Sequence, residues 1–456
     1  MGGRKILFLM WAEMSAYNAT FQLARTLVAR GYQVTYAVPE RWIETIARQG
    51  FPAVIIELSR EWPSHGSGWL RRILSSRKAA GERLTALRHS LRISEGFACV
   101  MVYTTLWQHA AALRQMGVPF ISINPSLAAS WSADVPPIFS SLKPEPRRPW
   151  LNRLRCSAAW LRLRYFGEFS HRYHGIIPDR PETPRARLRD VRTAARHFLF
   201  ATTERLRMPE YYRLLRLARG MGIKVAWGDY GHRLNGVEWV LGAKELDFAA
   251  RTTQPGRLYV GACVDPQRAE EGYDWSRVDA SRPLVYCSIG SHGGYWNQPN
   301  RLRLVRAAVE AFKIRPWYQL LLQLTGQQDE NLLGALPENV LAAPWFPQLE
   351  ALSRSALMMT HGGFGSVREA LFYGVPMILF PCGVDQPGNA ARVVLLGAGV
   401  QGDIRSVTPA SLGELLDHVM DDPAYSASAR RVRLALRANN DCAAALSYLD
   451  AFLSGR

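Results

Sequence analysis

The sequence lacks the features that would assign it to a membrane, to a secretory pathway or to a metal-binding class. It contains no uninterrupted apolar run of about 18 residues, the length that a helix needs to cross a bilayer. The apolar part of the opening MGGRKILFLMW is too short for a secretory signal and is better explained as a first strand. The six cysteines are scattered, with no CxxC pair and no ligand spacing. These absences predict reduced thiols, a cytoplasmic location and no metal site.

The composition that is present is typical of a large globular enzyme. The 456 residues exceed what one hydrophobic core usually supports, so two domains of about 200 residues each are expected. The net charge of +18 is local, because residues 68–92 carry seven Lys or Arg against one acid and residues 145–196 carry thirteen Arg against five acids. These arginines lack a nucleic-acid motif and an aromatic platform, so polyanion binding would be nonspecific.

Apolar strands and helical patterns alternate along the first half of the chain. The run KILFLMW reads as a buried parallel strand, EMSAYN as a loop, and ATFQLARTLVARGYQ as a helix that Gly31 ends. Further strands are expected at VTYAVP, FPAVIIEL, CVMVY, FISI and HFLFAT. This alternation predicts a doubly wound sheet.

A polar, turn-rich stretch at 250–282 indicates an interdomain connection, after which strands and helices alternate again. The second series comprises PLVYCSIGS, a helix near 300–312, YQLLLQL, VLAAPW, ALMMT, a helix from Ser366, and PMILFP. We therefore predict an α/β fold of two Rossmann-like domains that face a central cleft. The expected limits are 1–262 for the first domain, 263–437 for the second, and 438–456 for a final helix that packs back toward the first domain.

The stretch HGGFGS, residues 361–366, indicates an anion site. Three glycines after a strand let the backbone approach a ligand, and the N–H groups at the start of the following helix point toward it. Glycine turns of this kind also occur only to pack a helix, so the stretch alone leaves both explanations open.

Three neighbouring motifs carry a family resemblance. WFPQ (345–348), THGGFGSVREALFYGVPMILFP (360–381) and DQPGN (385–389) resemble the nucleotide-sugar signature of family 1 glycosyltransferases, the UDP-glycosyltransferase type with the GT-B fold, in bacterial-like form. The likeness extends more weakly to KELDF (244–248) with the following YVGACVD, and to the N-terminal βα unit.

The resemblance implies a role for each matching residue. At the nucleoside end, Trp345 would stack on the base beside the Phe346 backbone and Gln348, and Glu369 would accept hydrogen bonds from the ribose hydroxyls. The diphosphate would be held by His361, Gly363 and Ser366, with Gly290 and Ser291 as a second loop, and the sugar hydroxyls by Asp385 and Gln386. Structural alternatives remain for three of them: a core aromatic for Trp345, a solvated helix residue for Glu369 and a turn-former for Asp385.

The activity that the resemblance implies is a single inverting displacement. A hexose would pass from a UDP-sugar, glucose-like, or from a dTDP-sugar, to an acceptor nucleophile. The helix N-terminus and His361 would stabilise the charge that grows on the leaving phosphate, so no metal, no DxD motif and no cofactor are expected. A catalytically idle nucleotide-sugar-binding or lipid-binding homologue is the alternative.

At the positions where this family usually has its general base, the sequence has other residues. The histidine of a GHxNP-like loop falls on Ala16, and the aspartate that orients it falls near Tyr103. Glu13 in the same loop could serve as base, His109 could swing in from a later helix, or the acceptor could be a good nucleophile that needs none. Glu13 and His109 also have purely structural explanations. Acceptor contacts are expected at Ala16, Tyr17 and Trp107.

The two Arg-rich segments set Trp, Leu and Phe against arginines at roughly helical spacing. Helices of this kind either pack on the domain with a solvated basic face or lie on an anionic membrane surface. Since both fall in the domain that holds the acceptor in this family, we expect a bulky apolar acceptor, a lipid, polyketide, carotenoid or other natural product, taken from or near a membrane.

Overall fold

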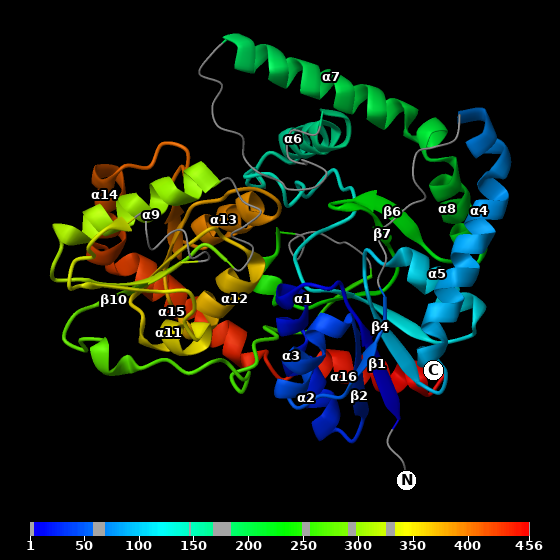
Figure 1. Cartoon of the computed structure of the whole chain (residues 1–456), viewed down its shortest axis with the longest axis horizontal. Helices are drawn as coiled ribbons and strands as arrows, with labels where there is room; N and C mark the ends of the chain where they lie inside the picture. Colours follow the sequence, from blue (N-terminus) through cyan, green and yellow to red (C-terminus); the bar gives the residue numbers. More distant parts are fainter. Residues whose placement is uncertain are drawn as a thin grey trace.

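The computed structural model describes residues 4–57, 69–145, 147–166, 184–248, 256–290, 298–324 and 333–455. These residues form two α/β domains, each on a parallel sheet, and a small antiparallel hairpin. Figure 1 shows the two domains side by side, the first in blue to green and the second in yellow to red. No helix in this part of the chain is both long and apolar enough to span a bilayer. The predicted α/β class and GT-B architecture are confirmed.

The first sheet has seven strands in the order β3-β2-β1-β4-β5-β8-β9, all paired in parallel. Strand β1 lies inside the sheet between β2 and β4, and its residues from Ile6 to Leu9 are fully buried because helices cover both faces. The order reverses between β1 and β4, so the loops that follow these two strands open at the same place. The strands are β1 Lys5–Leu9, β2 Gln33–Val38, β3 Ala53–Ile55, β4 Cys99–Tyr103, β5 Phe120–Asn124, β8 Glu238–Val240 and β9 Arg257–Tyr259.

Helices of the first domain cover this sheet and extend above it. Helices α4, α5 and α8 pack together over one face, while α7 runs along the top of the molecule above α6 (Figure 1). The hairpin of β6 Val225–Gly228 and β7 Gly231–Leu234 stands between them and the sheet edge. The helices are α1 Met14–Asn18, α2 Phe21–Ala29, α3 Ile43–Arg48, α4 Trp69–Ser90, α5 Trp107–Gln115, α6 Pro149–Leu161, α7 Pro184–Arg207 and α8 Pro209–Gly220.

The second sheet has six parallel strands in the order β12-β11-β10-β13-β14-β15, which reverses between β10 and β13. The loops after β10 and β13 therefore meet, as the loops after β1 and β4 do in the first domain. The strands are β10 Leu284–Ser288, β11 Gln319–Gln323, β12 Val340–Ala343, β13 Leu357–Thr360, β14 Met377–Leu379 and β15 Gly399–Gln401. The helices are α9 Gln298–Lys313, α11 Gln348–Arg354, α12 Phe364–Tyr373, α13 Gln386–Leu395, α14 Pro409–Asp421 and α15 Pro423–Ala438.

The chain ends in α16, Ala443–Leu453, which returns to the first sheet (Figure 1). Ala445 and Leu449 are buried in the same core as Phe8 of β1. The crossing is fixed by Gln22 of α2, whose amide donates to the carbonyl oxygen of Asn440 at 3.0 Å. The exact domain limits given above stay a prediction.

Several local expectations were wrong. HFLFAT is part of α7, where exposed Phe198 and Leu199 have no sheet to bury them and the flanking Arg- and Ala-rich sequence favours a helix. The expected loop EMSAYN contains α1, and the expected connection at 250–282 contributes β9 to the edge of the first sheet. Helix α12 begins at Phe364, two residues before Ser366, with Gly363 as its N-cap.

Candidate donor and acceptor site

His361 and two glycines form a close junction where β10 and β13 end. A Cβ atom at Gly290 would lie 2.6 Å from the His361 ring, and one at Gly363 would also lie 2.6 Å from it, so only glycine fits at either position. His361 is 9% exposed, and its Nδ1 lies 3.4 Å from the Thr360 hydroxyl oxygen. The first N–H groups of α12 start at the same point. The junction therefore offers an imidazole and helical N–H donors to an anion, as the resemblance implies for the diphosphate.

The nucleoside end contains one exposed and one buried aromatic residue. Trp345 is 41% exposed, so its indole face is free to stack on a base, which removes the core alternative for this residue. Phe346 is fully buried and packs edge-on against Tyr273, with ring centroids 4.8 Å apart. Only the backbone of Phe346 remains for a ligand.

Glu369 is buried and already paired. Its carboxylate accepts from Arg268 at 2.7 and 3.2 Å and from the Gln348 amide at 2.6 Å. Burial opposes its ionisation, but the Arg268 guanidinium and these hydrogen bonds outweigh burial and hold the pKa of Glu369 below its usual range. Three of about four acceptor positions on the carboxylate are used, which leaves one for a ribose hydroxyl.

The sugar end is formed by the loop before α13. Asp385 is the N-cap residue of this helix, and its carboxylate accepts from the Asn389 amide at 3.1 Å. Burial raises the pKa of Asp385 to about 6, with a smaller contribution from Glu13. Gln386 is 2% exposed, and its side-chain oxygen accepts from the N–H groups of Cys382 and Gly383. Gln386 therefore shapes the loop, and only its amide nitrogen remains for a sugar.

Glu13 lies across the domain boundary from Asp385. It caps the start of α1 in the loop after β1, and its carboxylate accepts from the Trp11 indole at 3.2 Å. Burial raises the pKa of Tyr103, at the end of β4, and the charges of Glu13 and Asp385 act in the same direction. One carboxylate of each domain therefore lies close to Tyr103, at the point where the strand order of the first sheet reverses.

His109 does not join this group. It is fully buried on α5, and burial together with the nearby Arg83 of α4 lowers its pKa to about 4. Neither ring nitrogen has a partner among the described residues. A neutral, enclosed imidazole on this face supports the packing explanation and argues against a role as base.

The residues expected to contact the acceptor are buried in the first domain. Ala16 and Tyr17 are 5% and 0% exposed and belong to the core between α1 and the first sheet. Trp107 is 2% exposed and packs edge-on against Tyr211 of α8 at 5.3 Å. All three side chains contribute to the core of the first domain, and their contact with an acceptor stays a prediction. Ser291, the remaining donor candidate, lies outside the described residues.

The sequence analysis missed Tyr230, at the tip of the β6–β7 hairpin. Its φ of 62° is in the left-handed region, which is strained for tyrosine and is often found near functional sites. The residue is 42% exposed, its ring packs edge-on against Phe139 at 4.9 Å, and burial, with smaller contributions from Asp385 and Tyr103, raises its pKa well above the ordinary value. The turn sequence GDYG was the only local signal for this position.

Asp229, also missed, fixes the loop beside Tyr230. It is fully buried and accepts from the N–H groups of Ala129 and Ile138 at 2.9 and 3.1 Å. Burial raises its pKa to about 7. The segment that it holds also meets the second domain, since Gly388 of α13 donates its N–H to the Ile138 carbonyl at 2.9 Å.

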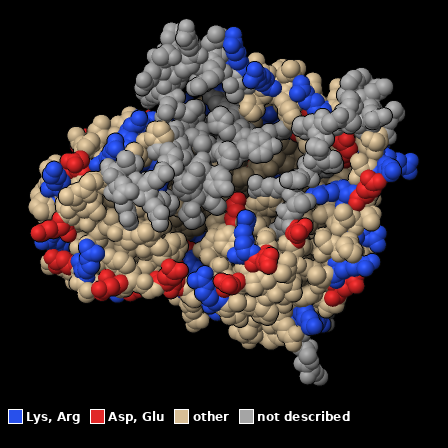
Figure 2. All heavy atoms as spheres, viewed as in Figure 1, with Lys and Arg blue, Asp and Glu red and all other residues tan. Residues whose placement is uncertain are grey.

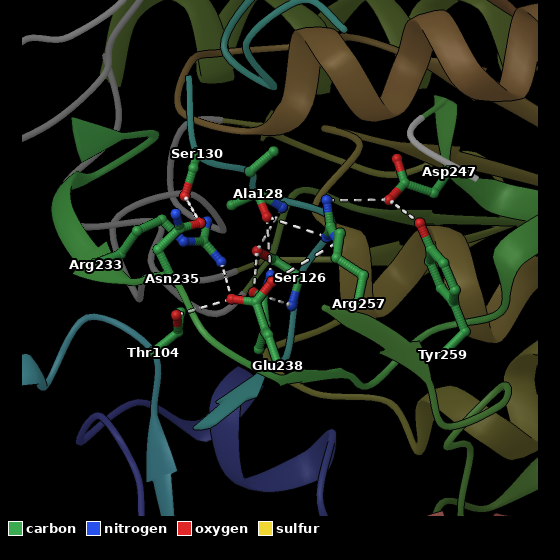
Figure 3. Close-up of polar contacts among 12 residues, drawn as sticks. Thr104, Ser126, Ala128, Ser130, Arg233, Asn235, Glu238, Asp247, Arg257 and Tyr259 are labelled. Atoms are coloured by element: carbon green, nitrogen blue, oxygen red, sulfur yellow. Dashed lines mark hydrogen bonds and ion pairs between the residues drawn. The ribbon is translucent and has the colours of Figure 1, made fainter. Parts of the chain in front are cut away.

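A buried charge network ties the two domains beneath this loop (Figure 3). Glu238 pairs with Arg233, lies 3.7 Å from Arg257 and accepts from the Thr104 hydroxyl at 2.8 Å. Asp247 continues the network: its carboxylate lies 3.4 Å from Arg257 and accepts from Arg392 of α13 at 3.1 Å and from the Tyr259 hydroxyl at 2.9 Å. The helix that begins beside Asp385 is thus held by the first sheet.

The pKa of Asp385 predicts a pH-dependent preference for the sugar. Below about pH 6 the carboxyl takes up a proton and loses acceptor strength toward sugar hydroxyls. We expect UDP-glucose to gain about tenfold in affinity relative to UDP between about pH 5 and pH 7, measured by calorimetry. Asp385→Asn should remove this pH step, and a wild-type affinity ratio equal at both pH values would contradict the assignment.

Comparisons with known proteins agree with this geometry. The family model for the C-terminal domain of erythromycin biosynthesis protein CIII-like proteins matches residues 319–444. Oleandomycin glycosyltransferase of Streptomyces antibioticus is 26% identical over 96% of this chain and 88% of its own. The glycosyltransferase of kitacinnamycin has a TM-score of 0.63 at 24% identity, over 98% of both chains. The rhamnosyltransferase SpnG with thymidine diphosphate has a TM-score of 0.59 at 17% identity, over 97% of this chain and 100% of its own.

The fold, the nucleotide-sugar motifs and these matches define an enzyme of the glycosyltransferase class. Over most of its length the chain is similar to bacterial glycosyltransferases, in agreement with the motif resemblance to the family 1 GT-B type.

Proposed function

We propose that the protein transfers a hexose from a UDP-sugar or dTDP-sugar to a bulky apolar acceptor, with inversion and without a metal ion. The observation that carries this proposal is that Glu13 follows β1 of the first domain, at the reversal of its strand order, and Asp385 caps α13 of the second, with the charge of Glu13 contributing to the raised pKa of Asp385. On the second-domain side the pair adjoins the loop system that holds His361 and the start of α12.

The proposed step follows from this arrangement. An acceptor hydroxyl gives its proton to Glu13 and attacks the anomeric carbon from the side of the first domain, while the bond to the phosphate oxygen breaks. The nucleoside diphosphate leaves toward α12, where His361 and the helical N–H groups stabilise its charge. Because attack and departure occur on opposite sides, the anomeric configuration inverts.

Two kinds of donor fit the exposed Trp345. An indole face stacks on uracil and thymine alike, since these bases differ by one methyl group. The thymidine diphosphate bound to SpnG supports a dTDP-sugar, while Trp345 and the Asp385-Gln386 pair match the motif of UDP-sugar enzymes. The relative named for oleandomycin supports a polyketide-like natural product as acceptor.

Donor hydrolysis separates an enzyme from a catalytically idle binder. Purified protein is incubated with UDP-glucose and dTDP-glucose without acceptor, and released nucleotide is measured; an acceptor screen with the better donor follows. Slow release that an apolar acceptor accelerates supports the proposal. Nucleotide binding with no release under any acceptor would favour the idle homologue.

The basic helices of the first domain support a further part of the proposal, contact with an anionic membrane on the cytoplasmic side. Trp150, Leu154 and Leu161 of α6 are 69%, 62% and 46% exposed and follow one line along the helix, because their spacings of four and seven residues are close to whole turns. Exposed Arg153, Arg155 and Arg162 flank this line. Figure 2 shows basic side chains at the top of the molecule, where α6 and α7 lie in Figure 1.

Sedimentation with vesicles tests the membrane contact. We expect the protein to bind phosphatidylglycerol vesicles at low salt, to bind less at high salt, and not to bind phosphatidylcholine vesicles. Trp150→Ala should weaken binding several-fold, whereas Trp317→Ala, which removes a tryptophan 55% exposed on the second domain, should not. No binding at low salt would reject the membrane part alone.

A further inference from the structure

We propose that Arg268 is a positioning residue of the donor site: it aims Glu369 at the donor ribose and ties this carboxylate to helices α2 and α3 of the first domain. Arg268 belongs to the segment between the two sheets, which we call the strap, residues 265–271. The proposal rests on the proposed function, because it assigns the ribose to Glu369.

The strap is fastened to the first domain by three side chains. Asp265 is 2% exposed and pairs with Arg25 of α2 at 2.8 Å. Gln49, directly after α3, is 5% exposed; its amide oxygen accepts from the Ala269 N–H and its amide nitrogen donates to the Ala269 carbonyl, both at 2.9 Å. Because the Gln49 amide makes both hydrogen bonds to the backbone of Ala269, it fixes the position of the strap relative to α3.

On its other side the strap is fastened to the nucleoside end of the donor site. Arg268, whose side chain is 6% exposed, donates through both terminal nitrogens to the two oxygens of Glu369. It also pairs with Glu270 at 2.6 Å, and Glu270 accepts from the N–H of Leu349 at 3.0 Å. Leu349 is in the first turn of α11, directly after Gln348, the other partner of Glu369.

This arrangement gives Arg268 a specific task. A planar guanidinium that bonds both oxygens fixes the plane of the carboxylate, so the remaining acceptor position has one direction. Without the guanidinium, a carboxylate that is 2% exposed would favour its neutral form, which is a weaker acceptor for a vicinal diol. The sequence showed no sign of this role, because Arg268 is about one hundred residues away from Glu369 in a turn-rich stretch.

The test compares nucleotides with and without ribose hydroxyls. Calorimetry gives the Kd of UDP and of 2′,3′-dideoxyuridine diphosphate, or of dTDP and 3′-deoxythymidine diphosphate if dTDP binds more tightly. The variants are Arg268→Met, Arg268→Lys, Glu369→Gln and the control Arg354→Met, which removes an exposed arginine of α11. We expect wild type and Arg354→Met to prefer the hydroxylated nucleotide by about tenfold.

Arg268→Met should reduce this preference to within about twofold, with little change in Kd for the deoxygenated nucleotide. The preference of Arg268→Lys should lie between those of Arg268→Met and wild type. The UDP affinity of Arg268→Met should also fall as the pH is lowered, because Glu369 has lost its bidentate partner and keeps only the weaker attraction of Arg368 and the Gln348 hydrogen bond. If wild type shows no preference, or if Glu369→Gln keeps the preference of wild type, the ribose role in the proposed function fails. The role of Arg268 is overturned if Glu369→Gln loses the preference but Arg268→Met keeps it, or if Arg268→Met weakens the binding of both nucleotides equally. Arg268→Lys takes the place of Arg268→Met in this comparison if the latter does not fold.

Discussion

Glu13→Gln is expected to lower kcat by about 10²-fold or more, with little change in the donor KM, because general-base help is typically worth 10²- to 10⁴-fold and an amide cannot take the proton. The side chain keeps its size and its bond from Trp11, so the loop after β1 should stay in place. Initial rates at saturating donor, with the acceptor found in the screen, measure the effect.

Glu40→Gln is the matched control, since Glu40 is an exposed glutamate of the same domain. It should leave the rate unchanged. If Glu13→Gln slows transfer less than tenfold, Glu13 is not the base. With His109 enclosed on α5, an acceptor that needs no base would then be the better explanation.

Glu238→Ala is expected to cause the largest loss of stability. The substitution leaves Arg233 and Arg257, side chains 1% and 6% exposed, without their shared carboxylate (Figure 3). Breaking a buried pair by removing one partner typically costs about 3–5 kcal/mol. We expect Tm to fall by roughly 6 °C or more in a thermal unfolding scan.

Glu350→Ala provides the comparison for this variant. Glu350 pairs with Arg354 at 2.8 Å, but both side chains are more than 40% exposed, so solvent screens the pair. Its Tm should stay within about 2 °C of the wild type. Equal shifts for the two variants would show that the network around Glu238 does not stabilise the domain.

Much of the fold could be predicted from the sequence because parallel strands leave a strong local signal. Runs such as KILFLMW and YQLLLQL are apolar on both faces, and both form interior strands, β1 and β11. HFLFAT carries a similar signal over six residues, but nothing within the segment shows that its neighbours continue a helix. A short apolar run of this length does not by itself distinguish a strand from part of a helix.

The site could be predicted only where function requires a local motif. Trp345, His361 and Gly363 lie within one signature; in the structure Trp345 is exposed and Gly363 lies against the His361 ring. Tyr230 and Arg268 depend on contacts across the domains, which no spacing reveals. The burial of Tyr17 and Trp107 could not be predicted, because a sequence does not show which face of a helix meets the core.

Nucleotide binding tests the central claim most directly, that the second domain binds a nucleoside diphosphate between Trp345 and the start of α12. Calorimetry with UDP and dTDP should give saturable binding to the wild type and a Kd about tenfold higher for Trp345→Ala, since stacking on an aromatic ring is worth roughly 1–3 kcal/mol. Binding of neither nucleotide, or an unchanged Kd in Trp345→Ala, would contradict the account.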